Sequence, residues 1–110
     1  MPTITADDTY VELIIFDVDD ADGQLLLLDG LIAQVNGWVM NIPGFVSSSF
    51  HFSHDGKKLF NYAQWRSRAA WENFGSDKRR DLIRDAVKVA GARHLSGQGY
   101  TVACVVEAAI

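Results

Sequence analysis

The sequence predicts a single α+β domain whose elements follow the order β-α-β-β-α-β. Stretches rich in β-branched and aromatic residues, or alternating with a period of two, indicate strands, and a helical spacing of apolar residues recurs between them. No repeat, low-complexity tract or linker divides residues 1–110, so we expect one domain. This order is that of the ferredoxin-like split βαβ arrangement, in which an antiparallel sheet carries its helices on one face.

The first half of the chain predicts a strand, a helix and one arm of a hairpin. Residues 9–18 are rich in β-branched and aromatic side chains, which is typical of a buried strand. Apolar residues recur with helical spacing over 24–40. Pro43 ends this helix, because proline disfavours helical conformation at the residue before it. Residues 44–53 then alternate as a strand.

The second half begins with the return arm of the hairpin. The dipeptide Asp55-Gly56 is a typical hairpin turn, and the stretch "KLFNYAQW" over 58–65 reads as the strand that follows it. Ser67 is placed to cap a short helix that Gly75 closes.

A second helix is expected after this one, capped by Ser76 or Asp77 and ending at Gly91. Residues 99–108 are predicted to form the last strand. The single cysteine, Cys104, falls within it and is interpreted as a small buried hydrophobe.

Helices on one face of the sheet leave the other face to be covered. We expect Tyr10, Ile14, Phe16 and Tyr62, together with the last strand, to make that face too apolar for water. Two copies that pack sheet against sheet would bury it. The sequence therefore predicts a homodimer.

The charge of the chain and its lack of a recognisable targeting pattern argue against some classes of function and location. The net charge of −4 argues against a nucleic-acid or membrane-surface role. No signal-peptide pattern or run of transmembrane length is present, and no disulfide can form within the chain, so we expect a cytoplasmic protein. All ten basic residues follow Gly56, against nine carboxylates and no basic residue before it. Either the two halves attract one another, or an arginine faces an acidic or phenolate ligand.

Three stretches, read with the order of elements, resemble the antibiotic biosynthesis monooxygenase family, whose members form dimeric α+β barrels. They are "PGFVSSSFH" (43–51), "DG" (55–56) and "NYAQWRSRAAWENF" (61–74). Within the family the chain resembles the cofactor-independent enzymes that oxidise anthrones to anthraquinones in aromatic polyketide pathways.

The resemblance implies that Asn61 and Trp65 line a substrate pocket between the sheet and its helices. Trp71 stands where related enzymes carry a tyrosine, so a hydroxyl role is missing there; an indole N–H can orient a carbonyl but cannot accept a proton. Arg84 matches an arginine of a relative once a gap is placed after Trp71.

Cofactor-free oxidation is consistent with the residues present. His51, His54 and His94 have no metal-ligand spacing, and no dinucleotide-binding fingerprint occurs. We therefore expect neither metal nor cofactor, with a polycyclic aromatic substrate and O₂ as the reactants. A deprotonated anthrone can itself supply the electron that O₂ must accept.

Such a reaction needs a flat apolar slot and a donor for the developing oxyanion. Asn61 can be that donor, and it lies roughly 13 Å from Trp65 along a strand, about the length of a tricyclic ligand. His51 is either a proton shuttle or a structural residue. The expected slot is lined by Trp65, Trp71, Phe50, Phe52 and Trp38.

Alternatives remain open for the function and for each residue. A tryptophan under helices is also typical of plain core, and the spacing of Arg84 fits a solvated helix face. A non-catalytic ligand-binding or assembly protein of the same fold is the main rival. A haem-degrading oxygenase is less favoured, because residues 67–91 contain no histidine to bind the iron.

Overall fold

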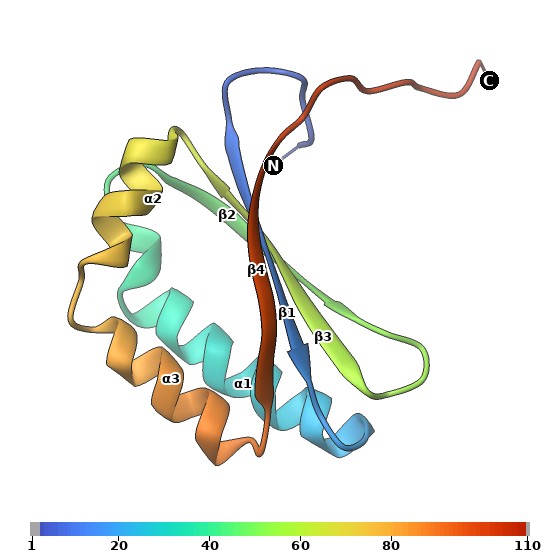
Figure 1. The fold of residues 1–110 in the computed structure, drawn as a ribbon, viewed down its shortest axis with the longest axis vertical. Coiled ribbons are helices and arrows are strands. Elements are labelled where there is room, and N and C mark those ends of the chain that lie inside the picture. Colours follow the sequence, from blue (N-terminus) through green and yellow to red (C-terminus); the bar gives the residue numbers. More distant parts are fainter. Residues whose placement is uncertain (1–2, 110) are drawn as a thin grey trace.

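The structure, a computed structural model, describes residues 3–109 as a four-stranded antiparallel sheet with three α-helices on one face (Figure 1). The strand order is β2-β3-β1-β4, which confirms the predicted split βαβ fold. The elements are β1 (Tyr10–Asp17), α1 (Ala21–Gly37), the 3₁₀ helix η1 (Val39–Asn41), β2 (Phe45–Phe52), β3 (Lys58–Trp65), α2 (Arg68–Gly75), α3 (Arg80–Val89) and β4 (Arg93–Thr101).

Strand β1 lies between β3 and β4, and its register decides which side chains face the helices. Tyr10 pairs with Trp65, and Phe16 pairs with Leu59, so alternate residues of both strands share the helix-facing surface. The expectation that Tyr10, Ile14 and Phe16 lie on the open face is therefore wrong. Tyr62 does lie on the open face, opposite Leu13.

The core consists of two apolar clusters between the sheet and the helices. One packs α1 against the hairpin end of the sheet, and the other packs η1 and α2 against the opposite end. The first contains Phe16, Val18, Leu27, Leu31 and Leu59, and the second contains Trp38, Val39, Ala63 and Trp65.

Helix α1 begins three residues earlier than its apolar spacing predicts. The side chain of Asp20 accepts a hydrogen bond of 2.9 Å from the backbone N–H of Gly23 and so caps the helix. The α-helix ends at Gly37, and the chain continues through η1 before Pro43. The hairpin turn before β3 is confirmed, with Gly56 at a φ of +76°.

The caps of the two later helices differ from each other. Ser67 caps α2 as predicted, because its Oγ accepts from the N–H of Ala70. Helix α3 begins only at Arg80, so a cap at Ser76 or Asp77 was wrongly predicted. Asp77 instead accepts from the backbone and guanidinium of Arg79, which holds the turn between the two helices.

A last strand was predicted over 99–108, but its bounds were wrong, since only residues 99–101 of that range lie in β4 (Arg93–Thr101). Strand β4 starts at Arg93, because Gly91, at a φ of +67°, turns the chain directly from α3 into the sheet. Its pairing with β1 ends at Thr101, opposite Tyr10. Residues 102–109 are in no strand and extend away from the sheet (Figure 1), so Cys104 is exposed instead of buried.

Ion pairs join the acidic first half of the chain to the basic second half. Arg93 at the start of β4 contacts Asp17 and Asp19 at 3.1 Å each, and Lys58 of β3 lies 3.5 Å from Asp17. The hydrogen bond from Arg93 is the main cause that lowers the pKa of Asp17. Part of the charge asymmetry in the sequence is thus satisfied within one chain.

The turn into β2 supplies a test of the packing between sheet and helices. Gly44 has a φ of +89°, and a Cβ there would overlap the Cβ of Ala70 in α2. Gly44→Ala should lower the free energy of unfolding by more than about 1 kcal/mol in urea denaturation. Gly37→Ala, where a Cβ meets nothing within 4 Å, should be neutral or stabilising. Equal effects of the two changes would contradict this account.

Candidate functional site

A polar seam crosses the helix-facing surface of the sheet between the two apolar clusters. It consists of Glu12 on β1, Asn61 on β3 and Ser48 on β2. Glu12 and Ser48 flank Ala63 of β3 on either side, and Asn61 occupies the next helix-facing position along that strand. Along the strands, the apolar side chains of the two clusters lie on either side of this polar seam.

Asn61 carries the clearest sign of a binding role in the seam. Its Oδ1 is buried and has no hydrogen-bond partner among the described residues. An unpaired buried polar group costs about 1–3 kcal/mol, which a purely structural position would avoid. Ile14 and Phe50 lie directly opposite Asn61 on the neighbouring strands. A ligand donor would satisfy this oxygen, and the amide N–H₂ can itself donate to a ligand.

Glu12 is the second buried polar group of the seam. It is only 6 % exposed, and its Oε1 accepts a hydrogen bond of 3.1 Å from the Tyr10 hydroxyl. Burial raises the pKa of Glu12, whereas the bond from Tyr10 and the charges of Arg80 and His94 oppose that rise. The pKa of Glu12 therefore lies above its ordinary value, and the carboxylate binds a proton more readily than that of an exposed glutamate.

Tyr10 links the seam to α2 and to β4. Its ring lies against Trp71 of α2, with centroids 5.3 Å apart. On its other side, the Tyr10 hydroxyl occupies the space that a side chain at position 99 would need, which explains the glycine there. Trp71 thus packs against the aromatic residue that holds Glu12.

A cleft of about 360 Å³ opens beside Tyr10, at the end of β1 and β4 and next to the start of α2. Its volume lies in the range of small-molecule sites, about 300–1,000 Å³. A second hollow, of about 530 Å³, adjoins the segment before β1, and Gln64 and Arg66 are among the residues that line it. Neither is lined by Asn61. The first is lined by Asp8, Tyr10, Arg68, Gln98, Gly99, Tyr100 and Thr101.

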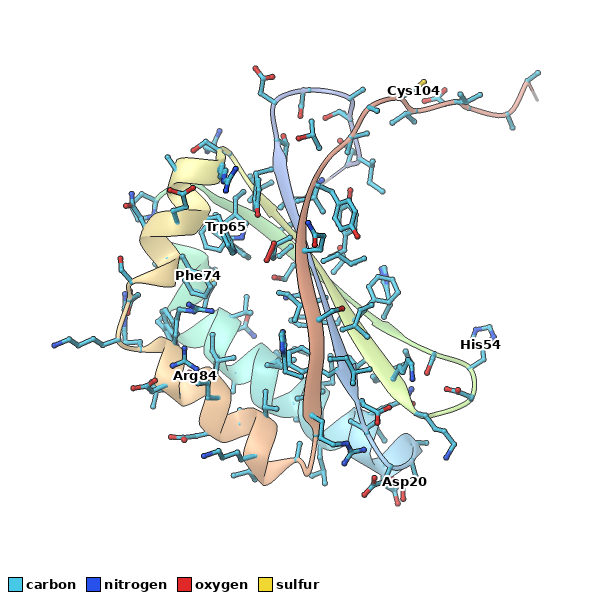
Figure 2. The ribbon with its side chains drawn as sticks, viewed as in Figure 1. Asp20, His54, Trp65, Phe74, Arg84 and Cys104 are labelled. Carbon is cyan, nitrogen blue, oxygen red and sulfur yellow. The ribbon has the colours of Figure 1, made fainter. Side chains whose placement is uncertain are left out.

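The tryptophans expected to wall the slot are packed into the second apolar cluster. Trp65 is 2 % exposed and stacks on Phe74 with centroids 5.0 Å apart, and both lie between α2 and the sheet (Figure 2). Trp38 also contacts Phe74 and donates from its indole to Gln34. These rings form a rigid aromatic wall at one end of the seam.

The other expected site residues are divided between the two faces. Phe50 packs on the first cluster beside Asn61, and Phe52 lies on the same face but is 41 % exposed near the hairpin. His51 lies on the opposite face, with its ring against Phe60. Arg84 is on the exposed side of α3 and pairs with Asp81 (Figure 2).

Sequence reasoning missed Glu12 and Arg80. The signal for Glu12 is present in "YVELIIFD", where it shares its strand face with Tyr10 and Phe16 and is the only charged residue on that face. Arg80 places its guanidinium over the ring of Phe74, at 5.3 Å, and donates to the Gly75 carbonyl. The positive charge of Arg80, and not that of Arg84, is among the causes that lower the pKa of Glu12 against the effect of burial.

Two observations concern the described residues as a set. Within residues 3–109, no three His, Cys, Asp or Glu side chains gather as a metal site requires. Across the same range, each helix is too short or too polar to cross a bilayer.

The fold and sequence are similar to those of a monooxygenase from Streptomyces coelicolor, ActVA-Orf6, whose structure contains nanaomycin D. The two chains are 30% identical over 91% of this chain and 92% of that one, with a TM-score of 0.79. The chain belongs to the antibiotic biosynthesis monooxygenase family. No family model matches it.

Two further relatives extend the comparison. Tetracenomycin-F1 monooxygenase of Streptomyces glaucescens is 43% identical over 53 residues, which are 48% of this chain and 47% of that protein, so the match spans about half its length. SnoaB of Streptomyces nogalater, a cofactor-independent oxygenase, shares the family fold at 14% identity, with a TM-score of 0.67 over 94% of this chain and all of that one.

The unpaired amide of Asn61 leads to a stability prediction. Asn61→Leu should raise the free energy of unfolding by about 1 kcal/mol, because it removes a buried acceptor that has no partner. The matched control is Gln24→Leu. The buried amide of Gln24 donates to the carbonyls of Ser53 and Lys58, so its loss should destabilise by about 1–3 kcal/mol. Urea denaturation measures both, and equal losses would show that Asn61 is engaged within the fold.

Proposed function

We propose that the protein is a cofactor-independent monooxygenase that oxidises a polycyclic aromatic polyketide of the anthrone type to a quinone with O₂. Family membership supports an oxygenase, and the observation that carries the proposal is the buried side chain of Asn61, whose Oδ1 has no hydrogen-bond partner among the described residues. This amide lies on a sheet face whose other side chains are largely aromatic and aliphatic. Such a surface suits a flat ligand that has one oxygen to be held.

For this reaction the protein has to position the substrate and provide a hydrogen-bond donor in surroundings that exclude water. Removal of a methylene proton converts an anthrone into an extended carbanion-phenolate, which passes one electron to O₂ and then combines with the reduced oxygen. Overall, a CH₂ group and O₂ give a carbonyl and water. A donor aimed at the substrate oxygen and exclusion of bulk water favour the charged intermediate.

Asn61 is assigned the role of that donor. Its position opposite Ile14 and Phe50 places the amide in apolar surroundings, where a hydrogen bond to an anionic oxygen is worth more than in water. Trp65 is assigned a supporting role, because its stacking on Phe74 fixes the wall beside the seam. The cleft beside Tyr10 supplies the approach from solvent.

A non-catalytic ligand-binding protein is the second candidate. Two observations favour it. Trp65 is closely packed, and Trp71, whose ring lies against that of Tyr10, offers no proton-accepting group. The two functions differ in turnover and not in ligand class.

We also propose that the protein functions as a homodimer in the cytoplasm. The face of the sheet away from the helices carries apolar side chains, and segment 102–109 exposes the further apolar residues Val105 and Val106. A neighbour of the same fold, from an uncultured marine organism, is described as dimeric, at 12% identity and a TM-score of 0.72. The apolar residues of this face include Leu13, Ile15, Phe60 and Tyr62.

Oxygen uptake tests the activity. Metal-stripped, colourless protein given a simple anthrone should consume O₂ and form one quinone per O₂. Asn61→Ala should lower the rate on the order of a hundredfold, as loss of one oxyanion donor does in other enzymes. The control is Asn73→Ala, an exposed amide on α2, which should leave the rate unchanged. No uptake above the spontaneous rate with several anthrones, with retained ligand binding, would favour the binding protein.

Sedimentation tests the dimer. Tyr62→Glu places a charge on the open sheet face and should yield monomers, because burying an unpaired charge is strongly unfavourable. Leu82→Glu changes an exposed apolar residue on α3 and should leave the dimer intact. A wild-type protein that sediments as a monomer at micromolar concentration would contradict the proposal.

A further inference from the structure

A carboxylate and an imidazole converge on a glycine of the edge strand. A Cβ built on Gly97 of β4 would lie 3.7 Å from Oε2 of Glu12 and 3.5 Å from Nε2 of His94. Both distances are ordinary contact distances, and Gly97 is exposed. The second oxygen of Glu12 therefore lies immediately beneath a point that a side chain at position 97 would occupy.

The same carboxylate lies between the cleft and the unpaired amide. Its Oε1 is held by Tyr10, which lines the 360 Å³ cleft. Glu12 is opposite Ala63, and Asn61 is the next helix-facing residue of that strand. Diagonal neighbours on adjacent antiparallel strands are about 7–8 Å apart. The distance between Glu12 and Asn61 is thus within the length of one planar ring system.

We propose that Glu12 is the catalytic base of this site, removing the methylene proton of the aromatic substrate while Asn61 holds the substrate oxygen. The inference rests on the proposed function for the identity of the substrate. In the step, the C–H bond breaks and an O–H bond forms at Glu12 Oε2. The electron pair stays on the substrate and spreads onto the oxygen that faces Asn61.

The groups around Glu12 suit this role. From β1, the Tyr10 hydroxyl donates to Oε1 and keeps the carboxyl oriented. From β4 and α3, His94 and Arg80 add their charges, which favour the ionised form against the effect of burial. The pKa of Glu12 is raised above its ordinary value, which increases the basicity of the carboxylate.

Hydrogen exchange without oxygen isolates this step from oxygenation. Anthrone carrying deuterium at its methylene carbon is incubated with the protein in H₂O under nitrogen, and mass spectrometry follows the loss of deuterium. The wild-type protein should accelerate the loss, and Glu12→Gln should reduce that acceleration by at least about a hundredfold. The wild-type rate should rise with pH through the raised pKa and then level, because only the ionised carboxylate is active.

Two further variants complete the design. Tyr10→Phe retains the ring but removes the donor that stabilises the carboxylate, so its exchange profile should move to higher pH with its plateau retained. Asp85→Asn, an exposed carboxyl on α3, should match wild type. Thermal melts show that each variant is folded before its exchange rate is compared.

The outcomes separate the two proposals. A folded Glu12→Gln variant that exchanges deuterium as fast as wild type overturns the role of Glu12, and oxygen uptake by wild type would leave the oxygenase proposal standing. Wild-type exchange that is lost in the variant supports Glu12 even if O₂ uptake is absent. Absence of both wild-type exchange and uptake contradicts both proposals.

Discussion

The antiparallel register of β1 between β3 and β4 is the constraint on which the remaining structure depends. Because β1 is paired on both sides, its alternation assigns every helix-facing position of the sheet at once. A shift of one residue would turn Phe16 outward and expose Glu12 to solvent. The same register aligns Asp17 with Lys58 and Arg93, so the ion pairs at the strand ends form only in the native alignment.

The polar seam lies where the two apolar clusters meet. The residues that stabilise the fold are therefore different from the residues proposed to act on the substrate. The clusters supply the burial that holds the helices on the sheet, whereas Glu12 and Asn61 each bury polar atoms at a cost. A protein selected only for stability would carry apolar residues at both positions. Residues that lower stability without helping the fold are typical of binding and catalytic sites.

The first three strands and the cap of α2 were predictable from the sequence, because alternation and the capping side chain of Ser67 act locally. The last strand was not: the apolar run after Tyr100 is a better strand by composition than the polar, glycine-containing β4. Pairing with β1 and the short turn at Gly91 outweighed that preference. Likewise, spacing placed Asn61 and Trp65 on one face, but the exposure of Arg84 and the contact of Arg80 with Phe74 depend on how α3 packs.

Edge strand β4 has a dynamic consequence. It pairs with β1 alone among the described strands, is exposed along nearly its whole length, and contains two glycines. Such a strand opens locally at a smaller free-energy cost than β1 and β3, whose amides stay protected until the sheet itself unfolds. Transient fraying of β4 would uncover Glu12 while the aromatic packing around Trp65 remained intact. Access of a ligand to Glu12 would thus depend on β4, whereas the global stability of the fold depends on β1 and β3.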